Sequence, residues 1–171
     1  MILTGTKIAE EVRSGNIVID PFDKDLVNPN SYNYRLGDRL LQIPDRVIES
    51  REEQRTEESQ IPAHGYLLQP HRVYLGHTYE VIGSNRYVPS LIGRSSLGRL
   101  GLFLQITADL GHIGTRHRWT LELTVVQPLI VYAYMKIGQV SFWVPEGLEA
   151  LDGQRYRDGV HSYSRYSVPQ P

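Results

Sequence analysis

The chain has 171 residues and a formal net charge of −1, from 18 basic and 19 acidic side chains. This length suits one domain with a single core over residues 1–171, and the balanced charge excludes a general positive field for a nucleic-acid backbone. The chain has no cysteine, which excludes disulfides, thiol nucleophiles and zinc sites built on thiolates.

The hydropathy pattern shows no membrane segment. No apolar run approaches the roughly 20 residues that a membrane-spanning helix needs, and the first residues do not resemble a signal peptide. We therefore expect a soluble, cytoplasmic protein that binds neither membrane nor nucleic acid.

The first predicted element is a short helix over residues 7–13, where apolar side chains recur at helical spacing. Thr4 or Thr6 is placed to cap its N-terminus, and Gly15 is placed to end it. No second helical pattern follows.

From residue 17 onward the chain consists of short β-rich runs separated by Pro, Gly, Asn and Asp. Many short strands with frequent turn signals favour a mainly β fold, either a distorted β-barrel or a jelly roll. The predicted strands cover residues 17–19, 32–36, 39–43, 66–68, 73–75, 102–106, 119–126, 129–132 and 139–144.

Two segments stand apart from this pattern. Residues 49–60, ESREEQRTEESQ, are charged and lack apolar periodicity, so we expect a solvated excursion between strands. Residues 153–171 are rich in Tyr, Arg and Ser and form a C-terminal tail or lid. We find no internal repeat, so the domain count stays at one.

The most informative stretch is GRSSLGRLG at residues 93–101, just before an apolar strand. Backbone N–H groups freed by glycine, serine hydroxyls and forked guanidinium groups are the parts that hold phosphate oxygens. The pattern G-x-x-x-x-G-K-[ST] is absent, so this is no P-loop. A polar turn with surface arginines remains the alternative from spacing alone.

Glu122 lies inside the predicted strand 119–126, between Leu121 and Leu123. The leucines share one face of the strand, and Glu122 points to the other face. If that face is covered, the carboxylate needs a partner, because an unpaired buried charge is costly. If the face is open, Glu122 is an ordinary outward-facing glutamate.

These residues together resemble the dCTP deaminases of the trimeric dUTPase-like superfamily. The resemblance covers most of the chain, with residues 49–60 unplaced, and implies a homotrimer with sites shared between subunits. It rests on MIL at the start, residues 17–22, Asn30-Ser31-Tyr32, GRSSLGRLG, Thr107-Ala108, Thr120-Leu121-Glu122 and Ile137-Gly138-Gln139.

The resemblance implies hydrolytic deamination of a cytosine deoxynucleotide, most directly dCTP to dUTP and ammonia. Glu122 would shuttle the protons, Ser95 would position the attacking water, and Arg99 would hold the carboxylate and the substrate. Zinc would play no part, because the metal-dependent deaminases need cysteines that this chain lacks.

The same resemblance implies the substrate contacts. Arg94, Ser95 and Ser96 match a phosphate-binding turn, and Gln139 matches a residue that touches the phosphates. The backbone at Thr107-Ala108 corresponds to the part that reads the base. Mg²⁺ would be held by substrate phosphates and water, with no protein ligand set.

Several positions depart from the family pattern. Where an acid for the sugar hydroxyl and an aromatic under the deoxyribose are expected, the chain has His112 and Thr115. Asp109 could take the acidic role only through a shifted loop. Asn33 replaces the Asp of an S-x-D motif. These changes raise the possibility of an altered sugar, base or phosphate preference.

The C-terminal tail also departs from the family motif K-Y-x-x-Q. Tyr163 is kept, whereas Ser162 and Tyr166 replace the Lys and the Gln. Arg157 or Arg165 can supply the missing cation, because a guanidinium binds phosphate at least as well as an ammonium.

Three alternative functions stay open at this point. One is a dUTPase, which would hydrolyse the α–β phosphate bond. Another is a bifunctional dCTP deaminase and dUTPase. Against both stand His112 at the position of the expected acid and the lack of a glycine-rich C-terminal arm. The third, from another class, is a nucleotide-binding regulatory protein without catalysis.

Overall fold

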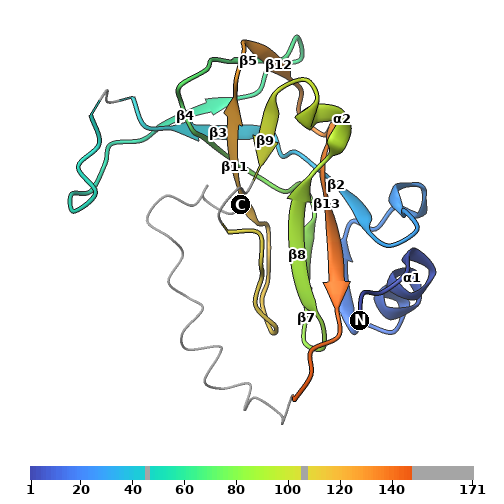
Figure 1. Ribbon diagram of the computed structural model, residues 1–171. Helices are drawn as coiled ribbons and strands as arrows, with labels where there is room; N and C mark the ends of the chain where they lie inside the picture. Colours follow the sequence, from blue (N-terminus) through green and yellow to red (C-terminus); the bar gives the residue numbers. More distant parts are fainter. Residues whose placement is uncertain (45–46, 105–107, 148–171) are drawn as a thin grey trace.

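The computed structural model describes residues 1–44, 47–104 and 108–147. Figure 1 shows short strands in several sheets, with one regular helix at the N-terminal end. The prediction of a mainly β fold with one short N-terminal helix is confirmed. Within the described ranges no helix is long and apolar enough to cross a membrane.

Helix α1 (Gly5–Arg13) begins two residues earlier than predicted. The Thr4 hydroxyl accepts a hydrogen bond from the Lys7 backbone N–H, so Thr4 is the N-cap. Gly15 has a φ of +77°, a conformation that glycine adopts without steric cost and that ends the helix. Ile8 is fully buried and anchors the helix to the core.

The strands form four open sheets whose neighbouring strands are all antiparallel. One three-stranded sheet has the order β1 (Ile17–Asp20), β7 (Val81–Ser84) and β10 (Arg116–His117), and the other has the order β2 (Tyr32–Arg35), β13 (Lys136–Trp143) and β8 (Val88–Gly93). The five-stranded sheet has the order β4 (Glu57–Gln60), β3 (Arg39–Gln42), β6 (Tyr74–His77), β11 (Thr120–Val125) and β9 (Leu102–Leu104). The two-stranded sheet pairs β12 (Leu129–Val131) with β5 (Tyr66–Leu68). A 3₁₀ turn, η1 (Lys24–Leu26), and helix α2 (Ser95–Gly98) complete the described elements.

The structure differs from the predicted architecture in several respects. It adds strands β7, β8 and β10, which were not among the predicted runs. The described strands form four sheets that do not join into one closed barrel. Residues 57–60 of the expected solvated excursion form edge strand β4, paired with β3. Both faces of this strand are polar, so the alternation that marks a half-buried strand is absent from its sequence.

The five-stranded sheet has one buried face and one outer face. Leu121, Leu123 and Val125 of β11 point into the core and are at most 3% exposed. Strand alternation therefore turns Glu122 outward. We define the outer face by the residues that share it with Glu122, namely Thr120 and Thr124 of β11, their partners His77 of β6 and Phe103 of β9, and Leu75, which lies opposite Glu122.

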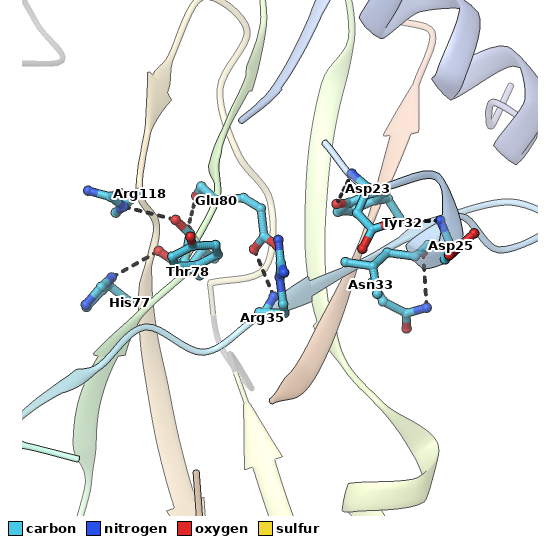
Figure 2. Close-up of polar contacts among 11 residues, drawn as sticks. Asp23, Asp25, Tyr32, Asn33, Arg35, His77, Thr78, Glu80 and Arg118 are labelled. Carbon is cyan, nitrogen blue, oxygen red and sulfur yellow. Dashed lines mark hydrogen bonds and ion pairs between the residues drawn. The ribbon is translucent and has the colours of Figure 1, made fainter. Parts of the chain in front are cut away.

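A buried ion pair ties the three-stranded sheet of β2 to the segment between β6 and β7. The Glu80 side chain is 0% exposed, and its two oxygens accept hydrogen bonds from the Arg35 Nε at 2.7 Å and the Arg35 backbone N–H at 2.9 Å. Figure 2 shows these two side chains pointing toward one another. The Arg35 guanidinium also lies over the Tyr79 ring.

Candidate active site

The GRSSLGRLG stretch runs from the last residue of β8 through helix α2 to the start of β9. Arg94 has extended backbone angles and precedes the helix, while Ser95 and Ser96 are exposed on its first turn. The Arg94 guanidinium donates to the Lys136 carbonyl oxygen at 3.2 Å. The Arg94 guanidinium and the two serine hydroxyls thus lie on one surface at the end of β8.

This turn lines a cavity of about 360 Å³. Gln139 of β13 lies on its wall, because β13 pairs with β8 on one side and β2 on the other. The cavity therefore contains four predicted substrate-binding residues. The complete lining is Asn28, Pro29, Asn30, Ser31, Asn33, Arg94, Ser95, Ser96 and Gln139.

Sequence reasoning did not assign a site role to Asn28, Asn30 or Ser31. They belong to the loop between η1 and β2, and the Ser31 hydroxyl donates to Gln139 Oε1 at 2.7 Å. The run N-P-N-S directly before a strand was the available signal, since such residues form turns rich in side-chain hydrogen bonds.

Glu122 lies on the face opposite Leu121 and Leu123, as the alternation predicted, and it is half-buried there. It lies opposite Leu75 of β6. Among the residues that the structure describes, its carboxylate makes no hydrogen bond or ion pair. Within the described ranges, a single chain thus presents this acid on the outer face without a partner of its own.

The structure does not join Arg99 or Ser95 to Glu122 within one chain. Arg99 is the exposed C-cap of α2, and its backbone N–H donates to the Ser95 carbonyl oxygen. Over the described ranges, no hydrogen bond or ion pair links either residue with Glu122. Ser95 lines the cavity beside Gln139, whereas neither Arg99 nor Glu122 does.

The segment after β9 runs beside β8. Asp109 and Gly111 exchange backbone hydrogen bonds with Leu91 and Pro89, and the Ser90 hydroxyl donates to the Asp109 carboxylate at 3.2 Å. Ala108 is exposed where this segment begins. Thr107 lies outside the described residues.

His112 and Thr115 form a tight turn. The Thr115 hydroxyl donates to the His112 carbonyl oxygen at 2.7 Å, and Thr115 is only 4% exposed. The His112 side chain is exposed. Thr115 is therefore committed to the turn, while the His112 ring lies at the surface. Tyr163 and Arg165 lie outside the described residues.

His77 is a buried histidine on the outer face, opposite Thr120. Its Nδ1 lies 3.0 Å from the Thr78 carbonyl oxygen, which can only accept, so Nδ1 carries the proton. Its Nε2 lies 3.5 Å from Asp38 Oδ1 without a hydrogen bond. Burial lowers the pKa of His77 below 6.5, and this effect outweighs the opposing ones of Thr78 and Asp38.

We expect the free energy of unfolding to fall as the pH drops below about 6.5. The buried imidazole resists the proton that the unfolded chain accepts, so acid favours unfolding. Urea titrations between pH 7.5 and 5.5 would measure this dependence. His77→Asn should weaken it while keeping a donor near Thr78. The exposed His64→Asn is the matched control.

His117, whose pKa burial also lowers, should supply part of the remaining pH dependence. If the His77 variant showed the same dependence of the free energy of unfolding on pH as the wild type, His77 would have the same proton affinity in the folded and unfolded states.

Comparison with known proteins gives consistent matches. A family model described as dCTP deaminase-like matches residues 2–144. A protein of Clostridium beijerinckii named "dCTP deaminase, dUMP-forming" is 44% identical over 142 residues, covering 83% of this chain and 82% of its own. One of Clostridium acetobutylicum with the same name is 37% identical over 169 residues, covering 99% and 95%.

Two further matches extend this picture. A "dCTP deaminase" of Rhodopirellula baltica is 45% identical over 147 residues, covering 86% of this chain and 74% of its own. The solved 2'-deoxycytidine 5'-triphosphate deaminase from Agrobacterium tumefaciens superposes with a TM-score of 0.67 at 20% identity. The match covers 84% of this chain and 46% of that longer one, and at this identity it shows a common fold.

Proposed function

The chain belongs to the dCTP deaminase-like family, and from this premise we propose that it hydrolyses the exocyclic amine of dCTP. Water adds to C4 of the cytosine ring and ammonia leaves, which gives the uracil nucleotide. The observation that carries this function is the family match over residues 2–144, which includes Ser95, Arg99 and Glu122.

The relatives change the expected product. The sequence favoured dUTP as the product, because His112 stands where the acid of a diphosphatase was expected. Relatives at 37% to 44% identity are instead named dUMP-forming. We therefore place a two-step reaction first, in which a second water cleaves the α–β phosphate bond of dUTP and releases pyrophosphate. Deamination alone is the second candidate, favoured by the relative from Rhodopirellula baltica.

A product assay separates these functions. We expect dCTP to yield ammonia and pyrophosphate in equal amounts, with dUMP formed and no dUTP accumulating. Ammonia with accumulated dUTP would establish deamination alone. Pyrophosphate from dUTP without ammonia from dCTP would establish a dUTPase, and binding without either product would establish a regulatory protein.

The same assay tests substrate preference. Thr115 is buried and hydrogen-bonded within its own turn, and His112 is exposed. The positions matched to sugar recognition thus carry neither the acid nor the aromatic side chain of the family pattern. Comparing dCTP, dCMP, CTP and a 5-substituted dCTP would reveal an altered preference, and a clear preference for unmodified dCTP would exclude one.

Glu122 is the proposed proton shuttle, Ser95 positions the attacking water, and Arg99 holds the carboxylate and the substrate. Support comes from the half-buried carboxylate of Glu122, which has no hydrogen-bond partner among the described residues. One carboxylate can take the proton from water and deliver it to N3 and then to the leaving amine.

The cavity at α2 is proposed to hold the phosphates. Among the described residues of its lining, Arg94 is the only charged side chain, and the others are neutral. Mg²⁺ prefers carboxylate oxygens and water, so this lining fits an ion held by the substrate phosphates, where it would neutralise their charge. Ala108 and Thr107 would face the base, and Tyr163 and Arg165 of the tail would close over the phosphates.

The site is proposed to form between subunits of a homotrimer. Phe103, which shares the outer face with Glu122, is 41% exposed, and Leu100 at the end of the α2 turn is 52% exposed. Exposed apolar side chains, one of them on the same face as an acid with no partner among the described residues, favour a surface that a second copy covers. A neighbouring subunit could then bring Ser95 and Arg99 to Glu122.

A further inference from the structure

A second cavity, of about 400 Å³, lies at the end of the five-stranded sheet where β3 begins and β6 ends. Among the described residues, its lining has none in common with the phosphate cavity at α2. None of its residues has a role in the proposed reaction. The lining consists of Asp38, Arg39, His77, Tyr79, Arg118 and Tyr134.

The His77 ring is held in one orientation on this lining. Its Nδ1–H donates to the Thr78 carbonyl oxygen, and the ring packs so closely on Gly37 that a side chain there would collide with it. His77 is only 5% exposed. Its Nε2 has no hydrogen-bond partner among the described residues. A buried nitrogen lone pair in a fixed direction is thus left to accept a hydrogen bond.

This lone pair faces a second acceptor, the carboxylate of Asp38. Nε2 of His77 lies 3.5 Å from Asp38 Oδ1, and a neutral imidazole has no hydrogen at this nitrogen when Nδ1 carries it. Burial lowers the pKa of His77 below 6.5, and the charges of Arg39 and Arg118 lower it further, so the ring is neutral at pH 7.5. A donor that reaches both atoms would relieve the repulsion between them.

Two guanidinium groups lie on the same lining. Arg118 Nε donates to the Tyr79 carbonyl oxygen at 3.0 Å, and Arg39 pairs with Glu58 at 3.2 Å. A guanidinium carries five N–H donors, so it can hold a protein acceptor and an oxyanion at once. Figure 2 shows the side chains of Arg118 and His77 next to each other. Cationic donors and a pair of acceptors therefore meet at one cavity.

We propose that this cavity binds a phosphate that still carries a proton, either orthophosphate or pyrophosphate. The guanidinium groups attract an oxyanion and disfavour a cationic donor such as an ammonium. The acceptor pair requires a hydrogen, which sulfate lacks at neutral pH, so sulfate would leave both acceptors unpaired. Orthophosphate and pyrophosphate meet both requirements, because each is an anion that retains a proton at pH 7.5.

Calorimetric titrations of the full chain at pH 7.5 and equal ionic strength test this site. Arg94→Met serves as the background, because it removes the arginine of the phosphate cavity at α2. In this background orthophosphate should bind at least about tenfold more tightly than sulfate. Methyl phosphate should bind as weakly as sulfate, because a phosphate monoester loses its last proton at about pH 6.

Two further substitutions separate the parts of the site. Asp38→Asn adds an amide N–H to the acceptor pair, so the preference for orthophosphate over sulfate should fall below about threefold. Arg118→Met removes a cation and should weaken orthophosphate binding about tenfold or more. Asp25→Asn and Arg116→Met make the same changes at exposed positions and are the matched controls. Thermal unfolding of every variant checks that it is folded.

Titration with pyrophosphate distinguishes the two sources of the phosphate group. Tighter binding of pyrophosphate would assign the site to a product of the proposed two-step reaction, and tighter binding of orthophosphate would assign it to the free ion. Equal affinities for orthophosphate and sulfate, no orthophosphate binding in the Arg94→Met background, or binding that Arg118→Met and Asp38→Asn leave unchanged would overturn the inference. Failure to release ammonia from dCTP would contradict the proposed function alone, because none of these titrations uses dCTP.

Discussion

Glu122→Gln should reduce ammonia release from dCTP by about 10²- to 10⁴-fold. Glutamine has nearly the same shape but cannot carry a proton between water, N3 and the leaving amine. Nucleotide affinity should change little, because the phosphate cavity does not include Glu122. Single-turnover ammonia release and calorimetric binding of dCTP measure the two quantities separately.

Glu146→Gln is the matched control, because it makes the same change at an exposed carboxylate. Full activity in the Glu122 variant would assign the proton transfers to another group. A parallel loss of affinity and turnover would instead indicate that the carboxylate mainly binds the substrate.

Mixing two inactive variants tests whether the site is shared between subunits. Glu122→Gln and Ser95→Ala chains, unfolded and reassembled together, should regain activity. Random trimers place an intact Ser95 against an intact Glu122 of the neighbour in about a quarter of the sites. A site within one chain would regain nothing, because each chain lacks one of the two residues.

Glu80→Ala should lower the free energy of unfolding by about 3–5 kcal/mol. Glu80 is fully buried and accepts both the side-chain and the backbone N–H of Arg35. Removing the carboxylate leaves a buried backbone donor and a partly buried guanidinium without their partner. Urea unfolding at neutral pH would measure the loss.

An exposed ion pair provides the comparison. Arg55 lies 2.9 Å from Glu57, with side-chain exposures of 76% and 42%. Such surface pairs contribute at most about 1 kcal/mol, so Glu57→Ala should have a small effect. If both variants lost a similar free energy of unfolding, burial would not explain how much the Arg35–Glu80 pair contributes to stability.

Local patterns were sufficient for several elements. The Thr4 cap, the apolar spacing of α1 and Gly15 together specify a short helix, since each acts over only a few residues. The alternation of Leu121, Glu122 and Leu123 predicted the direction of the acid correctly, because the side-chain period of a strand is two.

Other elements could not be predicted from local patterns. Residues 57–60 carry no apolar alternation, so their strand depends on pairing with β3. The sequence indicated a polar turn at residues 93–101 and no helix, whereas residues 95–98 form one turn of helix that buries Leu97. Tertiary packing determined both outcomes, since neither segment has a strong preference of its own.

The sequence by itself determined the mainly β class, the N-terminal helix, the outward direction of Glu122 and the polar turn at residues 93–101. Only the tertiary structure decided that this turn shares a cavity with Asn28 and Ser31, and that Ser31 reaches Gln139 across 108 positions of sequence. The physical reason is strand pairing. The register of β2 against β13 fixes which distant side chains meet, and no local pattern encodes that register.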